Sequence, residues 1–127
     1  MTGELLIDTS ALIDFFEQNS APETKEILAT ADLVISAITY GEIYKFLLNR
    51  GKTSEWQNIK TKLNNYKIID ATKETSEKAA ELSHRFGLSF ADSLIYATAI
   101  IHDLKLLTSD SDFKGKPNVI LGKRIQG

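Results

Sequence analysis

Short apolar runs alternate with longer helical segments along almost the whole of this 127-residue chain. Five runs have the length and composition of buried strands: residues 5–7, 33–35, 67–70, 105–108 and 118–121. Strands that alternate with helices form parallel sheets with helices on both faces. The pattern therefore predicts an α/β fold, a single three-layer α/β/α domain over residues 1–127 with a short central parallel sheet.

Capping residues and glycines mark the ends of the predicted helices. Five of these helices cover residues 11–17, 22–31, 54–66, 72–87 and 90–102. A sixth begins after Ser36 or Thr39 and ends before Gly51, a residue type that commonly follows a helix. Ser54 and Gln57 have the spacing of a capping box at the start of one helix.

Composition excludes several classes of protein. The chain has no cysteine, which rules out disulfides, thiolate zinc sites, iron–sulfur clusters and thiol catalysis. Its longest nearly apolar stretch, residues 94–101, is far shorter than the ~20 residues of a membrane helix. The first residues lack the basic start of a signal peptide. We therefore expect a soluble, cytoplasmic protein.

Three acidic residues directly follow predicted strands. Asp8 ends the first strand, and Asp110 and Asp112 follow the fourth. In open α/β sheets, ligand sites lie outside the carboxyl ends of the strands. Each acid also has a local alternative: Asp8 would cap the next helix, and the Ser-Asp-Ser-Asp segment would form an Asx turn.

Two further acids, Glu42 and Asp92, lie among apolar residues of predicted helices. A buried carboxylate without a partner is costly, so a carboxylate at such a position either forms a pair or is functional. For Glu42 taken alone, the favoured interpretation is an exposed ion pair with Lys45. The alternative for Asp92 is a capping box with Ser89, three residues earlier.

The local alternatives do not explain the joint pattern. In a parallel sheet, Asp8, Glu42, Asp92 and Asp110 all emerge at the same edge. Several carboxylates cannot all ionise close together without cations. Oxygen ligands suit Mg²⁺ or Mn²⁺ rather than zinc. Metals held in this way polarise a phosphate and lower the pKa of an attacking water, which is phosphoryl or phosphodiester chemistry.

The acidic residues and their neighbours resemble the four signature blocks of PIN-domain ribonucleases. These blocks are Leu-Ile-Asp8-Thr-Ser, Tyr-Gly-Glu42-Ile, Phe-Ala-Asp92-Ser-Leu and Leu-Leu-Thr-Ser-Asp110-Ser-Asp112-Phe. They occur in the family's order and span residues 5–113. As a short, single-domain chain, it is most similar to VapC-type toxins of toxin–antitoxin modules.

This resemblance implies a PIN-like fold and a metal-dependent endoribonuclease that leaves a 5′-phosphate and a 3′-hydroxyl. It implies Mg²⁺ or Mn²⁺ as cofactor, bound by a catalytic quartet of Asp8, Glu42, Asp92 and Asp110. It gives accessory roles to Thr9, Ser10 and Asp112. It further implies an RNA substrate, a cognate antitoxin protein and a homodimer.

Two other functions remain open on sequence alone. A non-catalytic PIN-like module would keep the fold and only bind a partner. A phosphohydrolase would use Asp8 as a nucleophile, but that chemistry needs a second acid two residues later, where Ser10 stands. Cleavage of RNA with Mg²⁺ or Mn²⁺ separates both from the nuclease.

The net charge of −2 argues at first against nucleic acid as a partner, because phosphate binding usually shows as a basic excess. Assigning five acids to one metal-bound pocket changes this, since 12 acids then face 15 lysines and arginines elsewhere. The basic residues that are candidates to line an RNA groove are Lys45, Arg50, Lys114, Lys116, Lys123 and Arg124.

Overall fold

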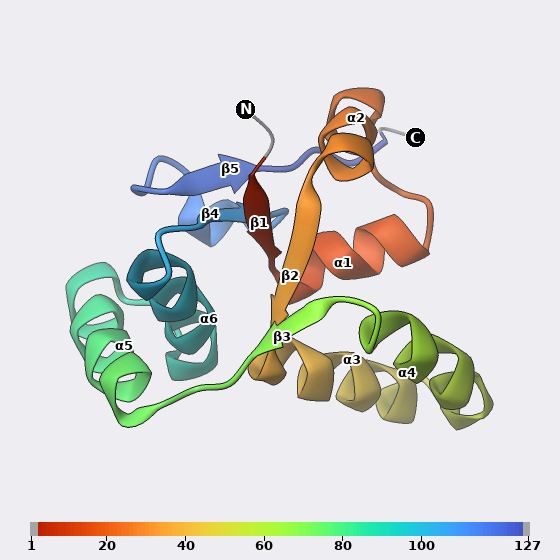
Figure 1. Ribbon diagram of the computed structural model, residues 1–127, viewed down its shortest axis with the longest axis horizontal. Helices are drawn as coiled ribbons and strands as arrows, with labels where there is room; N and C mark the ends of the chain where they lie inside the picture. Colours follow the sequence, from red (N-terminus) through yellow and green to blue (C-terminus); the bar gives the residue numbers. More distant parts are fainter. Residues whose placement is uncertain (1–2, 126–127) are drawn as a thin grey trace.

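The computed structural model describes residues 3–125 and shows a five-stranded parallel sheet with helices on both faces (Figure 1). The strands are β1 (Glu4–Ile7), β2 (Asp32–Ser36), β3 (Lys67–Ile69), β4 (Lys105–Thr108) and β5 (Val119–Leu121). Their order in the sheet is β3-β2-β1-β4-β5. The predicted parallel α/β fold is confirmed; the predicted domain ends, residues 1 and 127, lie outside the described residues.

Six α-helices and two short 3₁₀ turns connect the strands in the described part of the chain. The helices are α1 (Thr9–Phe16), α2 (Pro22–Thr30), α3 (Ala37–Asn49), α4 (Trp56–Leu63), α5 (Lys73–Phe86) and α6 (Phe90–Ile101). The turns are η1 (Thr53–Glu55) and η2 (Ser111–Phe113). In residues 3–125, no helix has the length and apolar character needed to cross a membrane.

Two hydrophobic cores lie on opposite faces of the sheet, because successive side chains of a strand point to opposite faces. Leu6 of β1 packs in one core with residues of α5 and α6, whereas the adjacent Ile7 packs in the other with residues of α1 to α4. Leu106 and Leu107 of β4 alternate in the same way. Figure 1 shows the result, with α5 and α6 on one side of the sheet and α1, α3 and α4 on the other.

Local signals fix most of the helix ends. The Ser36 side chain caps α3 by accepting a hydrogen bond from the Ile38 N–H. Thr72 and Thr75 form a reciprocal capping box at the start of α5. The same helix ends at Gly87, whose φ of 69° is a left-handed conformation that glycine adopts without strain.

The predicted capping box at Ser54 and Gln57 is wrong. Residues Thr53–Glu55 form η1 instead, and α4 begins at Trp56 without a side-chain cap. The Trp56 ring stacks on Tyr44 of α3, with 4.5 Å between the ring centroids. Tertiary aromatic packing against α3 therefore sets the start of this helix in place of a local cap.

The strand order places the ends of β1 and β4 side by side in the middle of the sheet. The chain leaves β1 toward β2 on one side and returns through β4 on the other, which makes this the point where the strand order switches direction. Ligand sites of open α/β sheets lie in the crevice at such a point.

Candidate active site

An open hollow of about 350 Å³ lies at the carboxyl edge of the sheet, beside the ends of β1 and β4. Its lining includes all four acids of the predicted quartet, contributed by four separate parts of the chain: Asp8, Glu42, Asp92 and Asp110. Thr9, Ser10 and Lys45 also line it. The structure thus brings the quartet together, as expected for acids that leave a parallel sheet at one edge.

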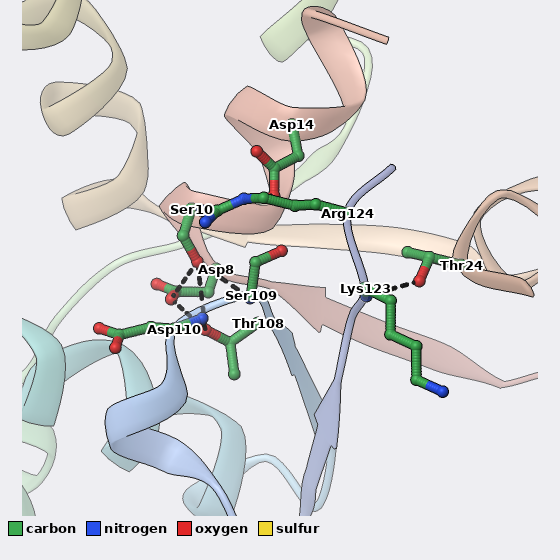
Figure 2. A network of polar contacts seen from close by, with 9 residues as sticks. All are labelled: Asp8, Ser10, Asp14, Thr24, Thr108, Ser109, Asp110, Lys123 and Arg124. Atoms are coloured by element: carbon green, nitrogen blue, oxygen red, sulfur yellow. Dashed lines mark hydrogen bonds and ion pairs between the residues drawn. The ribbon is translucent and has the colours of Figure 1, made fainter. Parts of the chain in front are cut away.

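Asp8 is the most buried member of the quartet, with 3% of its surface exposed. It precedes α1 in the N-cap position, but its carboxylate makes no capping hydrogen bond. The carboxylate instead accepts hydrogen bonds at Oδ2 from the hydroxyls of Thr108, at 2.7 Å, and Ser10, at 3.1 Å (Figure 2). The Asp8 side chain therefore bonds to residues around the hollow and does not cap the helix.

Burial raises the pKa of Asp8 to about 6. Removal from water is the main cause, and the negative charge of Asp92 adds to it. Hydrogen bonds from the Thr108 hydroxyl, the Thr9 backbone N–H and the Ser10 hydroxyl act in the opposite direction by stabilising the ionised form. A carboxylate in this balance holds a proton far more readily than an exposed aspartate does.

Two hydroxyls connect the ends of β1 and β4. The Thr108 hydroxyl also accepts a hydrogen bond from the Asp110 N–H, at 3.0 Å. The Ser10 hydroxyl accepts one from the Ser109 N–H, at 3.1 Å. These bonds fix Asp8 relative to Asp110, as Figure 2 shows. Sequence reasoning missed Thr108; its place at the end of β4, two residues before Asp110, was the available signal.

Glu42 is positioned by a threonine and not by a lysine. The Thr9 hydroxyl donates to Glu42 Oε1 at 2.6 Å. The ion pair with Lys45, the alternative considered for Glu42, is not formed in the described residues. Thr9 begins α1 and Glu42 lies on α3, so the contact joins the two helices at the wall of the hollow.

Asp92 is surrounded by like charges. Its pKa is raised, first by burial and then by repulsion from Asp110, Glu42 and Asp112. The Ser89 hydroxyl lowers the pKa, and it also accepts a hydrogen bond from the Asp92 N–H at 3.1 Å to cap α6. Asp92 therefore lies in the first turn of α6, and its ionisation is opposed by the negative charges of acids from other parts of the chain.

Asp110 takes part both in a local Asx turn with Asp112 and in the lining of the hollow. Asp110 Oδ1 accepts a hydrogen bond from the Asp112 N–H at 2.9 Å, which is the Asx turn considered above. Asp110 still lines the hollow, whereas Asp112 is exposed on η2 and is not part of the lining. Asp112 acts on the site through its charge beside Asp92.

The donor set of the hollow fits a hard divalent cation. Its four carboxylates share the lining with a single basic residue, Lys45, and the repulsion between them adds to burial in raising the pKa of Asp92. A bound Mg²⁺ or Mn²⁺ would relieve that repulsion. Among residues 3–125, no three acidic or histidine side chains are arranged as a ready-made metal site, so the fit is one of donor chemistry.

Of the predicted RNA-binding residues, Lys45 is the one that lines the hollow itself. The Arg50 guanidinium does not line the hollow but lies 4.4 Å from the centroid of the Phe46 ring, which does. The Lys116 ammonium donates to the Asp112 carbonyl oxygen and lies over a phenylalanine of α5. Lys114 is exposed just after η2.

The sequence profile of the PIN domain matches residues 5–118. Among solved structures, a toxin–antitoxin complex from Klebsiella pneumoniae is similar, with a TM-score of 0.80, 30% identity, and coverage of 95% of this chain and 99% of that chain. VapBC2 from Rickettsia felis, bound to a DNA fragment from its promoter, has a TM-score of 0.72 and 22% identity, over 96% and 99% of the two chains. The second likeness shows the fold alone. No curated protein matches the chain.

Proposed function

The chain belongs to the PIN domain family, and on that premise we propose that it is a VapC-type toxin with metal-dependent endoribonuclease activity. One observation carries the proposal: four carboxylates from separate elements line one open hollow at the carboxyl edge of the sheet. The proposed unit of function is one nuclease domain formed by the whole chain.

In this proposal Asp8, Glu42, Asp92 and Asp110 hold Mg²⁺ or Mn²⁺. The metal, when bound, polarises the phosphate of the RNA and lowers the pKa of the attacking water. The protein's own residues position the carboxylate that would hold the metal. Burial keeps water from solvating Asp8, and the Thr108 and Ser10 hydroxyls hold its carboxylate in one orientation. A preorganised carboxylate needs little rearrangement to bind a cation.

Thr9 and Ser10 have distinct accessory roles in the proposal. Thr9 donates to Glu42, and Ser10 donates to Asp8, so each hydroxyl orients one acid of the quartet. Both follow Asp8 directly, where α1 begins. The two residues thus act as positioning residues, and Asp112 contributes negative charge beside Asp92.

The proposed partners are an RNA substrate, a cognate antitoxin protein and a second copy of the chain. The similarity to a toxin–antitoxin complex over 95% of the chain supports the antitoxin. An antitoxin would keep the nuclease inactive until it is released. Sequencing of the cleavage products would identify the RNA target.

The burial of Asp8 argues against the alternative in which this residue is a nucleophile. Its Oδ2 atom already accepts two hydrogen bonds, and the side chain is almost fully covered. A nucleophilic carboxylate must present an oxygen to the substrate in line with the leaving group. In the proposal Asp8, which lines the hollow, is a ligand of the cation.

Cleavage of RNA by the purified, antitoxin-free chain tests the proposal. We expect cuts in a panel of transfer, ribosomal and messenger RNAs with Mg²⁺ or Mn²⁺, and none with EDTA. Asp92→Asn should lower the rate at least a hundredfold, because it removes an acid of the hollow. Asp70→Asn is the matched control, since Asp70 also follows a strand, is exposed and does not line the hollow. Absence of cleavage across the panel, or an Asp92→Asn rate equal to that of Asp70→Asn, contradicts the proposal.

A further inference from the structure

We infer that Arg124 binds a backbone phosphate of the RNA at the edge of the hollow, and that the buried Asp14 orients its guanidinium for this contact. The inference rests on the proposed RNA substrate. It adds a binding residue from the C-terminal segment, which follows all four acids of the quartet in the sequence.

The backbone around Arg124 is held in place on both sides. After β5, residues 122–125 run along the loop between α1 and α2, where Ser20 and Arg124 form an antiparallel bridge. The Ala21 N–H donates to the Lys123 carbonyl at 2.8 Å, and the Ile125 N–H donates to the Asn19 carbonyl at 2.8 Å. The position of Arg124 is therefore fixed before its side chain makes any contact.

The side chain of Arg124 is held through its Nε atom. Its Nε donates to Asp14 Oδ2 at 2.7 Å. The Asp14 side chain is 8% exposed, whereas that of Arg124 is 57% exposed. The bond uses Nε, and within residues 3–125 the two terminal amino groups of the guanidinium make no side-chain hydrogen bond or ion pair. A guanidinium fixed in this way presents a planar pair of donors, the geometry that binds phosphate.

The ion pair lies next to the hollow. Ser10 and Asp14 are four residues apart on α1, so they share one face of the helix and are separated by one turn, about 6 Å along its axis. Ser10 lines the hollow. In Figure 2 the Arg124 side chain extends from the C-terminal segment past Asp14 in the direction of Ser10.

An RNA strand needs positive charge at this edge. The lining of the hollow has four carboxylates and one lysine, so it attracts metal ions but repels the phosphates on either side of the one being cleaved. Single-stranded nucleic acid is held by grooves whose cations follow the backbone. Arg124 supplies such a cation, held by Asp14 one helical turn along α1 from Ser10, which lines the hollow.

The neighbouring Lys123 provides a built-in comparison. Its backbone makes the same kind of contacts, with its N–H donating to the Thr24 hydroxyl at 2.8 Å. Figure 2 shows its side chain pointing away from the acids and from Arg124. Lys123→Gln and Arg124→Gln therefore make the same change of charge at adjacent positions, but only the second removes a cation from the edge of the hollow.

Binding of a labelled single-stranded RNA, measured by fluorescence anisotropy over a range of salt concentrations, tests the inference. Each variant is combined with Asp92→Asn, so that the RNA remains intact in the presence of Mg²⁺. We expect Arg124→Gln to weaken binding about tenfold, as for the loss of a hydrogen bond between charged groups. It should also reduce the slope of log K against log salt by about 0.7, the value for one phosphate contact on a single strand. Lys123→Gln should leave binding within twofold and the slope unchanged.

The outcomes separate this inference from the proposed function. If the Asp92→Asn protein binds none of the RNAs and the unmutated chain cleaves none, both fail. If it binds RNA and Arg124→Gln behaves like Lys123→Gln, the nuclease proposal stands and Arg124 serves only to join the C-terminal segment to α1.

Chemical modification of the unmutated chain covers the case in which Arg124→Gln does not fold. Phenylglyoxal reacts with exposed arginines, and mass spectrometry reports each site separately. In EDTA, RNA should protect Arg124 at least fivefold and leave Arg85, which lies on α5, unprotected. Equal labelling of Arg124 with and without RNA overturns the inference.

Discussion

Replacing Asp8 by asparagine should make the protein more stable at neutral pH. The carboxylate of Asp8 is buried, and the pKa of the group is raised from 3.8 to about 6. An asparagine has nearly the same shape, and its side-chain oxygen can accept the hydrogen bonds from Thr108 and Ser10. The substitution thus removes a buried negative charge and leaves the packing intact.

The magnitude follows from the pKa of Asp8. A raised pKa means that the folded protein binds the proton more tightly than the unfolded chain does, so ionisation of Asp8 destabilises the fold. One pKa unit corresponds to about 1.4 kcal/mol, so a shift of roughly two units corresponds to about 3 kcal/mol at pH 7.5. Burying the amide N–H groups of asparagine offsets about 1 kcal/mol of this. We expect a net gain of about 2 kcal/mol.

The gain should depend on pH in one direction only. Above about pH 6, Asp8 is ionised in the folded wild-type protein and the whole deficit is present. As the pH falls through 6 toward 3.8, the carboxylate takes up a proton and the deficit is lost. Below pH 3.8 the group is neutral in both states, so the charge-dependent gain of the variant should disappear.

Urea unfolding in EDTA, at pH 7.5 and pH 4.0, measures the difference between wild type and Asp8→Asn under each condition. Asp14→Asn is the matched control, because Asp14 is also buried but has Arg124 as a cationic partner at 2.7 Å. That variant should lose about 1 kcal/mol at pH 7.5. An Asp8→Asn variant less stable than wild type at pH 7.5, or a gain of equal size at both pH values, refutes the burial argument.

Three further predictions concern the surroundings of the site and the helices. Thr108→Val removes the donor to Asp8 and the acceptor of the Asp110 N–H, and it should lower the free energy of unfolding by about 1–3 kcal/mol in urea at pH 7.5; an unchanged midpoint contradicts this role. The affinity for Mg²⁺, measured by calorimetry, should fall as the pH is lowered through 6, because protons compete for Asp8; equal affinities at pH 7.5 and 5 contradict it. Gly87→Ala should cost about 1 kcal/mol of stability because φ is 69° there, whereas Gly41→Ala, inside α3 with open space around the added Cβ, should gain up to about 1 kcal/mol; the same sign for both would refute the conformational argument.

The fold could be predicted from the sequence because its signals are local. Each strand is a short apolar run between polar segments, and residues such as Thr72, Ser89 and Gly87 mark the helix ends within one turn. The start of α4 could not be predicted in this way. It depends on Trp56 packing against Tyr44, a contact between separate helices that no local spacing encodes.

Of the candidate site, too, one part could be predicted from the sequence and another part could not. That the four acids lie at one edge follows from the direction of the strands alone. The contacts that hold these acids in place do not follow from strand direction, because they join residues that are distant in the sequence. Thr108 reaches Asp8 across 100 residues of sequence, and Arg124 reaches Asp14 across 110. Both contacts depend on which strands are neighbours, and strand order is set by packing and not by any one segment.

The surroundings of Asp8 also connect stability to the proposed activity. A chain selected only for stability would place a neutral residue there, since burying the carboxylate costs free energy at neutral pH. The cost is recovered if a cation binds, because binding to the folded state alone adds stability by mass action. Mg²⁺ should therefore raise the melting temperature of the wild-type protein and leave that of Asp8→Asn nearly unchanged. Equal shifts in the two proteins would mean that the buried charge of Asp8 has no part in holding a metal.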